Sequence, residues 1–245
     1  MENNVSLFIP VYNAARLIRK ILRQSYYALL QLHNDFEIII VDDNSPDSSY
    51  RFKRIIDSAR QIRGKEIRYI SYTKGPSRRE NLAKSFHLAN YEIIGFIDAD
   101  FSCDVLYFLQ ALDMLKEKSA DIVIGSRYIK GAKVQMHVIR RIFSFFYNMF
   151  IRMFFKSKIK DHQCGLKVFR RSSTMQIISE MGYDSKYIRG WFWDAEFLIR
   201  AQKAKLNIIE MPVKWHHADS STFNIRRELK CLISIINLKR KLLKS

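Results

Sequence analysis

Short apolar runs alternate with longer segments of helical periodicity along the first half of this chain of 245 residues. Runs rich in β-branched residues predict buried strands near 5–12, 36–42, 67–72, 91–98 and 121–126. The segments between them predict helices over 14–32, 48–63, 78–89 and 104–118. This alternation is typical of a doubly wound α/β fold, in which helices flank a mainly parallel central sheet.

The second half of the chain is less regular. The pattern predicts an apolar slab over 138–156, strands near 166–170 and 207–213, and helices near 172–181 and 194–204. The sequence contains no repeats, no low-complexity tract and no linker rich in Pro or Gly. We therefore expect one domain over 1–223, with a separable tail over 224–245.

The tail has the pattern of an amphipathic helix. Its apolar side carries Ile225, Leu229, Leu232, Ile233, Ile236 and Leu243. Its other side is mostly basic and carries Arg226, Arg227, Lys230, Lys241 and Lys244. Such a helix either packs on the core of its own protein or lies on anionic lipid. The basic charge of the rest of the protein favours the lipid.

Most of the net charge of +18 comes from two segments. Residues 127–160 contain nine Lys or Arg and no acidic residue, and residues 224–245 contain seven Lys or Arg and one Glu. The apolar run 142–155 (IFSFFYNMFIRMFF) lies inside the first of them. Nucleic-acid surfaces interleave single aromatic residues with charge, whereas apolar slabs bordered by Lys and Arg are typical of helices in a membrane interface. We expect an anionic membrane surface as partner and no nucleic acid.

The three cysteines, the N-terminus and the hydropathy bear on location. Cys103, Cys164 and Cys231 have neither metal-ligand nor CxxC spacing, which is typical of reduced, cytosolic proteins. The first residues lack the features of a signal peptide, and no run approaches the roughly 20 apolar residues that cross a bilayer. We expect a cytoplasmic protein, peripheral on the cytoplasmic membrane face.

Two pairs of carboxylates follow predicted strands. Asp42 and Asp43 end the run 36–41, and Asp98 and Asp100 end the run 91–97. Parallel strands bring such residues to the carboxyl edge of one sheet, where open α/β sheets bind ligands. Mg²⁺ is typically held by one or two carboxylates and the phosphates of a substrate. The alternative is that each Asp caps the helix that follows it.

Five motifs in order resemble a known family. They are VSLFIPVYN at 5–13, VDDNSPDS at 41–48, FIDADF at 96–101, IGSRY at 124–128 and DHQCGLKVFRR at 161–171. Together they are similar to family 2 inverting glycosyltransferases with the GT-A fold, over about residues 5–217. Within that family they resemble the dolichyl- and polyprenyl-phosphate sugar synthases. QCGLK at 163–167 and WDAE at 193–196 resemble the dolichyl-phosphate β-glucosyltransferase branch more than the mannosyltransferases.

The resemblance implies a metal-dependent enzyme that uses a nucleotide sugar. It implies Mg²⁺ or Mn²⁺ at Asp98 and Asp100, which are also candidate catalytic residues. The implied nucleotide-binding set is Pro10, Tyr12, Asn13, Asp42, Asp43, Lys74, Arg79, Asp98, Ala99 and Asp100. Lys74 and Arg79 are placed in it as phosphate contacts. Arg127 is a further candidate catalytic residue that would contact phosphate, because a planar guanidinium binds phosphate through two donors. A solvated surface position is the alternative for these cations.

The acceptor decides what the nucleophile requires. A hydroxyl group needs a general base, whereas a phosphate monoester is already anionic and needs only positioning by cations. Asp194 lies where hydroxyl-accepting relatives place their base, but its aromatic setting resembles the lipid-phosphate enzymes, so we expect it to position the sugar or the acceptor. The expected acceptor contacts are Arg127, Arg140, Arg141, Gln163, Lys167 and Trp193.

The chain departs from the family pattern at three places. Ala14 replaces a Glu, Ser102 replaces a Gln or Asp, and 215–221 (WHHADSS) replaces a closing Gly-Ser-Lys. The missing lysine implies that His216, His217 or a lysine of the tail takes over its contact with phosphate.

The sequence thus favours an enzyme that moves one sugar, with inversion, from a UDP- or GDP-sugar to a polyprenyl or dolichyl phosphate. One alternative is a family 2 transferase acting on a saccharide hydroxyl, with Asp194 as its base. Another is a non-catalytic basic module that binds RNA or membranes, for which the carboxylate pairs would have no use.

Overall fold

The computed structural model describes residues 4–32, 34–46, 54, 67–77, 79–100, 102–183, 189–190, 192–216 and 231–244. The helix expected over 48–63 lies outside these residues, apart from Arg54. His217, the segment 218–221 that follows it, and the first part of the tail also lie outside them.

A seven-stranded sheet forms the centre of the molecule, with the strand order β3-β2-β1-β4-β7-β5-β8. The strands are β1 (Val5–Val11), β2 (Phe36–Asp42), β3 (Ile67–Ser71), β4 (Ile93–Phe96), β5 (Ile122–Ser126), β7 (Lys167–Arg170) and β8 (Ile208–Pro212). Every residue of β2 is buried, as expected for a strand covered on both faces. Only β7 runs antiparallel to its neighbours, β4 and β5, so the expected mainly parallel sheet is confirmed.

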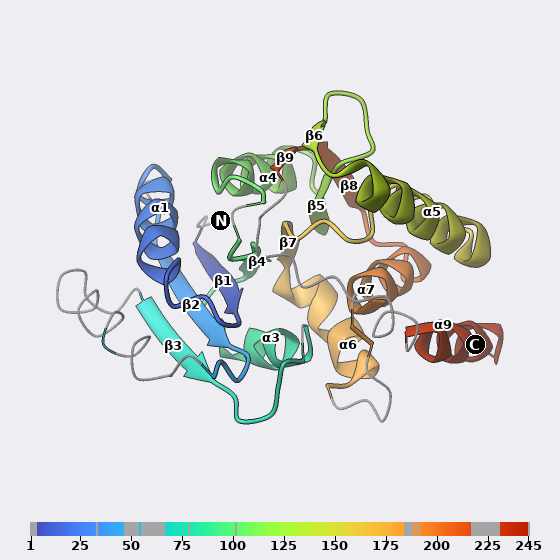
Figure 1. Ribbon diagram of the computed structural model, residues 1–245, viewed down its shortest axis with the longest axis horizontal. Coiled ribbons are helices and arrows are strands. Elements are labelled where there is room, and N and C mark those ends of the chain that lie inside the picture. Colours follow the sequence, from blue (N-terminus) through green and yellow to red (C-terminus); the bar gives the residue numbers. More distant parts are fainter. Residues whose placement is uncertain are drawn as a thin grey trace.

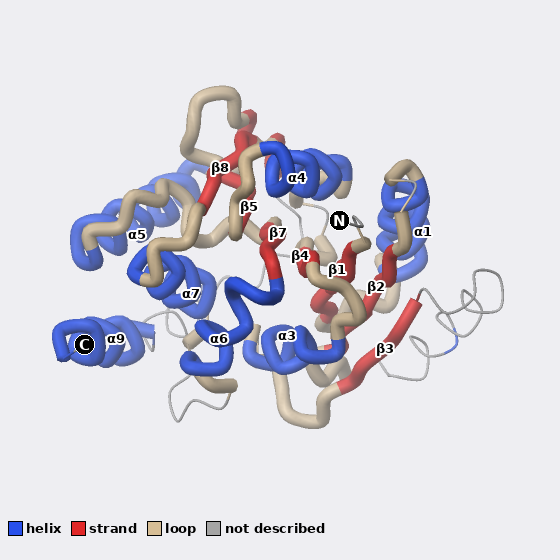
Figure 2. Tube along the Cα trace, turned by 180° about the vertical axis from the view of Figure 1, so that it is seen from behind, coloured by secondary structure: helices blue, strands red, loops and turns tan. Residues whose placement is uncertain are grey.

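Helices cover both faces of the sheet (Figure 1). On one face lie α1 (Ile18–Leu30) and α4 (Leu106–Glu117). On the other lie α3 (Glu80–Ser85), the 3₁₀ turn Phe86–Leu88, α6 (Arg171–Met181) and α7 (Phe192–Lys203). The tube in Figure 2, seen from behind, has the same two layers. Each layer packs on its own apolar cluster, so the sheet lies between two cores.

A third apolar cluster lies beside the sheet, between α5 (Val138–Phe155), α7 and α9 (Cys231–Lys244). Ile235 and Leu238 of α9 are buried there against Ile151 and Phe192. The tail therefore forms the expected helix over its described part, but one side of that helix packs on the protein's own core. The sequence did not distinguish this buried side from the outer face of α9, because the outer face is apolar too. Ile233 lies on that outer face and is half-exposed.

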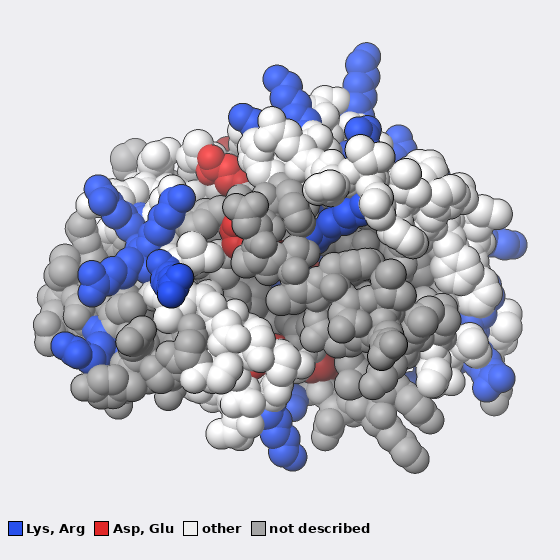
Figure 3. Space-filling model, viewed as in Figure 1, with Lys and Arg blue, Asp and Glu red and all other residues white. Residues whose placement is uncertain are grey.

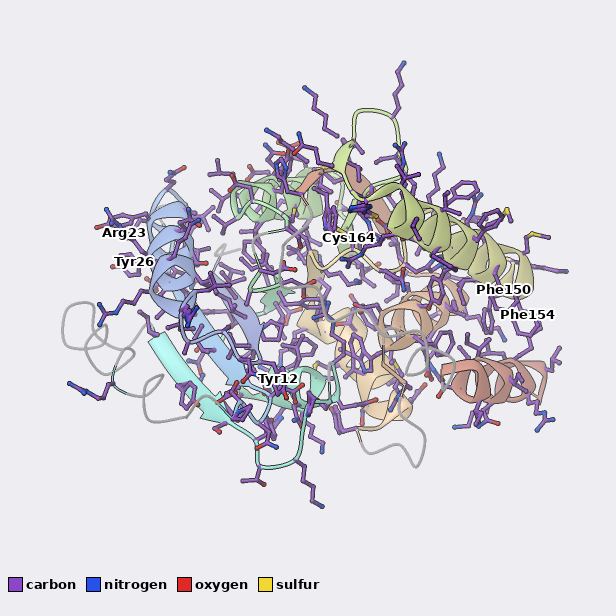
Figure 4. All side chains as sticks on the ribbon, viewed as in Figure 1. Tyr12, Arg23, Tyr26, Phe150, Phe154 and Cys164 are labelled. Carbon is purple, nitrogen blue, oxygen red and sulfur yellow. The ribbon has the colours of Figure 1, made fainter. Side chains whose placement is uncertain are left out.

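Two lysines tie α9 to its neighbours. Lys239 Nζ donates a hydrogen bond to the carbonyl oxygen of Phe154 at 2.5 Å, and Lys203 Nζ donates one to that of Leu242 at 2.9 Å. Figure 4 shows Phe150 and Phe154 near the end of α5 that is closest to α9. Lys239 thus faces α5.

A small second sheet pairs β6 (Lys133–Gln135) with β9 (Lys214–His216) in parallel. Neither strand was expected, because three residues are too few for periodicity to reveal. An isolated bridge also joins Trp215 to Cys103, so β9 lies beside the segment that follows β4.

Within the described part of the chain, no helix has both the length and the apolar composition needed to cross a bilayer. Lys and Arg side chains are distributed around the rim of the face drawn in Figure 3, where few acidic side chains are visible.

Candidate active site

The predicted carboxylate pairs lie at one edge of the sheet. β1 pairs in parallel with β2 on one side and with β4 on the other. Asp42 is the last residue of β2, and Asp98 and Asp100 follow the end of β4. The two pairs therefore flank the carboxyl end of β1. The parallel strand β5 leads Arg127 to the same edge, and the antiparallel β7 begins there with Lys167.

Hydrogen bonds fix both carboxylates at the end of β2. Asp42 accepts from the hydroxyl of Tyr69 at 2.6 Å and from the backbone N–H of Ser45 at 3.0 Å. Asp43 accepts from the backbone N–H and the hydroxyl of Ser77, and from Asn81 Nδ2 at 2.5 Å. Burial raises the pKa of Asp43, against the effect of these donors. Both side chains are held rigidly in the wall of the site.

The other residues expected at the nucleotide lie in front of these carboxylates. The ring of Tyr12, at the end of β1 near α3, is 40% exposed (Figure 4). Asn13 has a positive φ of 53°, and its backbone N–H donates to Ser45 Oγ at 3.0 Å. Pro10 is half-buried in the last part of β1, and the side chain of Lys74 is exposed after β3. These positions leave Tyr12, Asn13 and Lys74 open to a ligand.

Asn81 was missed by sequence reasoning. Its side-chain amide donates to Asp43 and to the carbonyl oxygen of Lys74, so it joins the loop after β3 to the end of β2. The only sequence signal was a polar residue on the expected buried side of helix 78–89.

The two carboxylate oxygens of Asp98 have different neighbours, Arg79 and Gly165. Arg79 Nη1 donates to Asp98 Oδ1 at 2.8 Å. The other oxygen, Oδ2, lies so close to Gly165 that a Cβ atom there would be 1.9 Å from it. Burial raises the pKa of Asp98, and the charge of Asp100 adds to this effect while Arg79 opposes it.

Asp100 has a more open setting. Its Oδ1 accepts from the backbone N–H of Ser102 at 3.0 Å, and its side chain is half-buried, as is that of Ala99. The Asp98 side chain keeps 34% of its surface exposed. Both carboxylates can therefore be reached from solvent.

Asp194 forms the centre of a buried chain of charges. Its Oδ1 accepts from Lys167 Nζ at 2.7 Å, and its Oδ2 accepts from Arg79 Nε at 3.1 Å. Lys167 Nζ also donates to the carbonyl oxygen of Cys164 at 2.7 Å. Burial acts to raise the pKa of Asp194, but the two cations outweigh it and hold the pKa below its usual value.

Lys167 and Trp193 do not fit the contact with an acceptor that we expected of them. Lys167 is 0% exposed because its ammonium group faces Asp194, and Trp193 is 1% exposed because its ring stacks on Phe197 in the core under α7. The apolar neighbours Leu166, Val168 and Phe192 were compatible with burial, but Asp194, the partner that lets Lys167 be buried, is 27 positions away in the sequence.

Arg127 is engaged with Asp161. Its Nε and Nη2 donate to the two carboxylate oxygens at 2.7 and 2.8 Å, and its backbone N–H donates to Oδ2 at 3.0 Å. Asp161 also accepts from the backbone N–H of Gln163 at 3.1 Å. Burial opposes ionisation of Asp161, but Arg127 prevails and lowers its pKa. Arg127 therefore anchors the segment that leads to Gly165, and its donors on this side are occupied.

A hollow of about 490 Å³ opens beside Arg127. It is lined by Arg127, Tyr128, Ile129, Ala132, Val138, Arg141, Ile142, Phe145 and Phe146. Arg140 lies on the inner side of α5, with its guanidinium 5.5 Å from the ring centre of Trp215. Burial and the charge of Arg127 lower the pKa of Arg140, against the attraction of Asp100. Arg140 thus lies between the hollow and the carboxylate edge.

His216 lies at the same edge. Its backbone N–H donates to the carbonyl oxygen of Ser102 at 2.9 Å, and its Nδ1 is 2.7 Å from Gln135 Oε1. This places it beside the segment that carries Asp100.

The side chains at the edge can hold a hard cation. Within the described residues no three His, Cys, Asp or Glu side chains form a metal-binding group. Asp98 and Asp100 supply two carboxylates that solvent reaches. That donor set fits an ion that completes its coordination with phosphate oxygens and water, as Mg²⁺ commonly does.

The known proteins that this chain resembles are described as glycosyltransferases. The family model described as Glycosyl transferase family 2 matches residues 6–178. Glycosyltransferase AglD of Haloferax volcanii is 27% identical over 227 residues, which are 92% of this chain and 35% of that protein. The dolichyl-phosphate β-glucosyltransferase of Saccharomyces cerevisiae is 27% identical over 233 residues, 89% of this chain and 68% of the relative. The chain thus spans about a third of the first relative and about two thirds of the second.

Solved structures of similar shape confirm the GT-A fold. Mannosyltransferase PcManGT of Pyrobaculum calidifontis, in complex with GDP-Man and Mn²⁺, matches with a TM-score of 0.64 and 18% identity, covering 98% of this chain and 64% of its own. Glucosyl-3-phosphoglycerate synthase of Mycobacterium tuberculosis, in complex with Mn²⁺, UDP-Glc and phosphoglyceric acid, matches with a TM-score of 0.67 and 14% identity, covering 96% and 79%.

Proposed function

The chain belongs to glycosyl transferase family 2, and from this premise we propose that it moves one sugar, with inversion, from a UDP- or GDP-sugar to a polyprenyl or dolichyl phosphate. We place the reaction at the cytoplasmic face of a membrane. The dolichyl-phosphate β-glucosyltransferases among the relatives support a lipid phosphate as acceptor.

The donor is proposed to bind where the two carboxylate pairs flank β1. Tyr12, Asn13 and the end of β2 would hold the nucleoside, with the exposed Lys74 near its phosphates. Asp98 and Asp100 would hold Mg²⁺ or Mn²⁺, consistent with the Mn²⁺ named for the two solved neighbours. When bound, the ion supplies Lewis-acid stabilisation of the departing diphosphate.

The observation that carries the choice of acceptor is the burial of Asp194 between Lys167 and Arg79. A hydroxyl acceptor needs a base with a free oxygen and a pKa near neutrality. Each oxygen of Asp194 instead accepts from a cation, and its pKa is lowered. A side chain in this state holds its neighbours in place but is a poor proton acceptor. A phosphate nucleophile, which is already anionic, has no need of one.

The hollow beside Arg127 is the proposed acceptor site. Arg141 lines it, and Arg140 lies between it and Asp100, so positive charge faces an entering phosphate. Phe145 and Phe146 also line it and are 52% and 54% exposed. A charged head next to exposed aromatic rings suits a lipid that carries a phosphate.

We also propose that the outer face of α5 lies on an anionic membrane. Val138, Ile139, Ile142, Phe143, Phe145, Phe146, Met149, Phe150 and Met153 are all at least 37% exposed. Apolar faces of this kind bordered by arginines are typical of interfacial helices. A peripheral position would bring the hollow to the depth at which a lipid phosphate lies.

The proposal is tested by incubating the protein with Mn²⁺ and a panel of UDP- and GDP-sugars, with and without polyprenyl phosphate or a saccharide as acceptor. We expect nucleotide release from one donor that rises when the lipid phosphate is added, together with a lipid-linked sugar. Release that responds only to a saccharide would favour the hydroxyl acceptor instead. Asp100→Asn provides the inactive control for both outcomes.

A further inference from the structure

The side chain of Arg79 already contacts Asp98, a carboxylate that the proposed function assigns to the metal. Arg79 Nη1 donates to Asp98 Oδ1 at 2.8 Å. Oδ2 of the same carboxylate lies against the backbone of Gly165. A divalent ion that binds Asp98 therefore meets an oxygen that the guanidinium holds.

The guanidinium is fixed from behind. Arg79 Nε donates to Asp194 Oδ2, and Asp194 in turn accepts from Lys167, whose ammonium group is fully buried. Arg79 also lies over the ring of Phe96, with 4.9 Å between the guanidinium carbon and the ring centre. One end of the group is thus anchored in the protein interior, while the other end reaches the half-exposed carboxylate.

We propose that Arg79 is a built-in counter-cation of Asp98 that a divalent metal displaces, and that Asp194 and Lys167 are the positioning residues that hold it. Displacement frees the Nη donors of Arg79 while Nε stays on Asp194. The freed donors then face the diphosphate that arrives with the metal, since guanidinium groups bind phosphate well. The Nη groups of Arg79 thus exchange Asp98 for a phosphate when the nucleotide sugar binds.

This arrangement has two consequences. The free protein keeps Asp98 paired with a cation, which is favourable because a partly buried carboxylate without a partner is costly. It also weakens the binding of metal alone, because the ion has to break a charged hydrogen bond. Binding of metal together with a nucleotide diphosphate is favoured, because the guanidinium gains a new partner.

The test is the affinity for Mn²⁺ without nucleotide, followed by the electron paramagnetic resonance of the free ion. Arg79→Met removes the charge but keeps an unbranched stem over Phe96. We expect the Kd for Mn²⁺ to fall by about tenfold, the scale of one charged hydrogen bond. Asp194→Asn should act in the opposite direction and raise the Kd, because Asp98 then becomes the only anionic partner of Arg79 among the described residues. A merely structural role would not give opposite signs.

Arg140→Met is the matched control. It removes one positive charge from the same edge, close enough to interact with Asp100. If charge alone mattered, Arg140→Met would tighten Mn²⁺ binding as much as Arg79→Met, and that result would overturn the displacement. An unchanged Kd in Arg79→Met would overturn it as well.

A measurement on the unaltered protein covers the case in which a variant fails to fold. Side-chain ¹⁵N resonances of arginine are followed while Mg²⁺ and UDP or GDP are added. We expect the Nη signals of Arg79 to shift and its Nε signal to remain in place. If the Nη signals do not respond although Mg²⁺ binds, the inference is wrong.

The inference rests on the proposed function for the identity of the metal carboxylates, but the two fail separately. Sugar transfer that proceeds while Arg79→Met binds Mn²⁺ as the unaltered protein does would remove the inference alone. If no variant binds Mn²⁺ with or without nucleotide, the metal assignment fails and the inference falls with it.

Discussion

Asp98 and Asp100 follow the same strand but have different partners. Asp98 is enclosed by Arg79 and Gly165, whereas Asp100 is half-buried and accepts a hydrogen bond from the backbone N–H of Ser102. Loss of the Asp98 carboxylate would remove one of the anionic partners that hold Arg79. Loss of the Asp100 carboxylate would leave the surrounding packing intact, which makes it the cleaner probe of metal binding.

We expect Asp100→Ala to abolish sugar transfer while the melting temperature stays within a few degrees of the unaltered protein. The lost interaction is stabilisation of the diphosphate by the metal, and the half-buried side chain adds little to the core. Removing the metal with EDTA should have the same effect. Activity that survives both treatments would show that the metal assignment is wrong.

Gly165 offers a second probe of the same site. A Cβ atom at this position would be 1.9 Å from Asp98 Oδ2, so Gly165→Ala has to displace the carboxylate. A displacement of about 1 Å in a catalytic group can cost roughly 100-fold in rate, and we expect a loss of that order in kcat. Steady-state kinetics at saturating Mn²⁺ measure it. Unchanged kcat in a folded variant would mean that the position of Asp98 is not critical.

His162 links the pH to stability. It is buried, its Nδ1 donates to Asn148 Oδ1 at 3.0 Å, and its Nε2 accepts from the hydroxyl of Ser157 at 2.8 Å. The tautomer follows from these partners. Burial lowers the pKa of His162 to about 4. Because the unfolded chain takes up the proton more readily, the neutral ring stabilises the fold above pH 6.5 and this contribution is lost as the pH falls towards 4.

The expected loss is about 3 kcal/mol, from a pKa difference of roughly 2.5 units at 1.36 kcal/mol each. His162→Gln removes the titrating group. The difference in free energy of unfolding between the two proteins, measured with urea at pH 7 and pH 4.5, should therefore shrink or reverse at the lower pH. A difference that does not depend on pH would contradict the assignment.

Single residues also mark the limit of prediction from sequence. Asp42, Asp98 and Asp100 were predicted at one edge because each follows an apolar run, and strand ends are visible in a sequence. The partners of Asp194 were not predictable, because Arg79 lies 115 positions away and only the tertiary fold brings the start of α3 to Asp194 of α7. Burial of Lys167 was missed for the same reason.

Helix α5 has one buried face and one exposed apolar face. Asn148 and Ile151 are buried against the body of the protein, while Phe146 and Phe150 are 54% and 43% exposed. The sequence left open whether these two phenylalanines belong to the core. Their exposure excludes that alternative, so both can be changed without emptying a packed interior.

We expect the double change of Phe146 and Phe150 to Ser to leave the fold intact but to weaken binding to anionic liposomes and to raise the KM for the lipid acceptor. The physical reason is the loss of apolar surface that salt does not screen. Sedimentation with liposomes at two salt concentrations measures it. Tyr27→Ser on α1, where the ring is 50% exposed, is the matched control and should change neither quantity. Undiminished binding of the double variant would contradict a membrane role for α5.

The tail illustrates how an element can be predicted and still be misplaced. A helix was predicted there, and α9 is one. Packing on the protein's own core was the alternative that the sequence left open, but the side that packs was not predicted, since Ile235 and Leu238 complete an apolar cluster with Phe192 that no linear pattern could reveal. The lipid contact expected of the basic residues stays a prediction, while Lys239, which the pattern did not place among them, donates to the carbonyl oxygen of Phe154.

In the molecule as a whole, the order of the strands explains the site. Most strands were predicted from the sequence, because buried parallel strands give continuous apolar runs. The antiparallel insertion of β7 between β4 and β5 was not, because pairing partners cannot be read from short runs. That insertion matters most for function, since it brings Gly165 against Asp98 and Lys167 against Asp194.

The central claim is transfer of a sugar to a lipid phosphate without a base. Its most direct test is the product formed from the active nucleotide sugar and polyprenyl phosphate by the unaltered protein and by Asp194→Asn, at saturating Mn²⁺. We predict a sugar phosphate of the lipid whose anomeric configuration, read by NMR, is opposite to that of the donor, and measurable turnover by Asp194→Asn. Sugar found only on a saccharide hydroxyl, with turnover by Asp194→Asn reduced by several orders of magnitude, would contradict the claim.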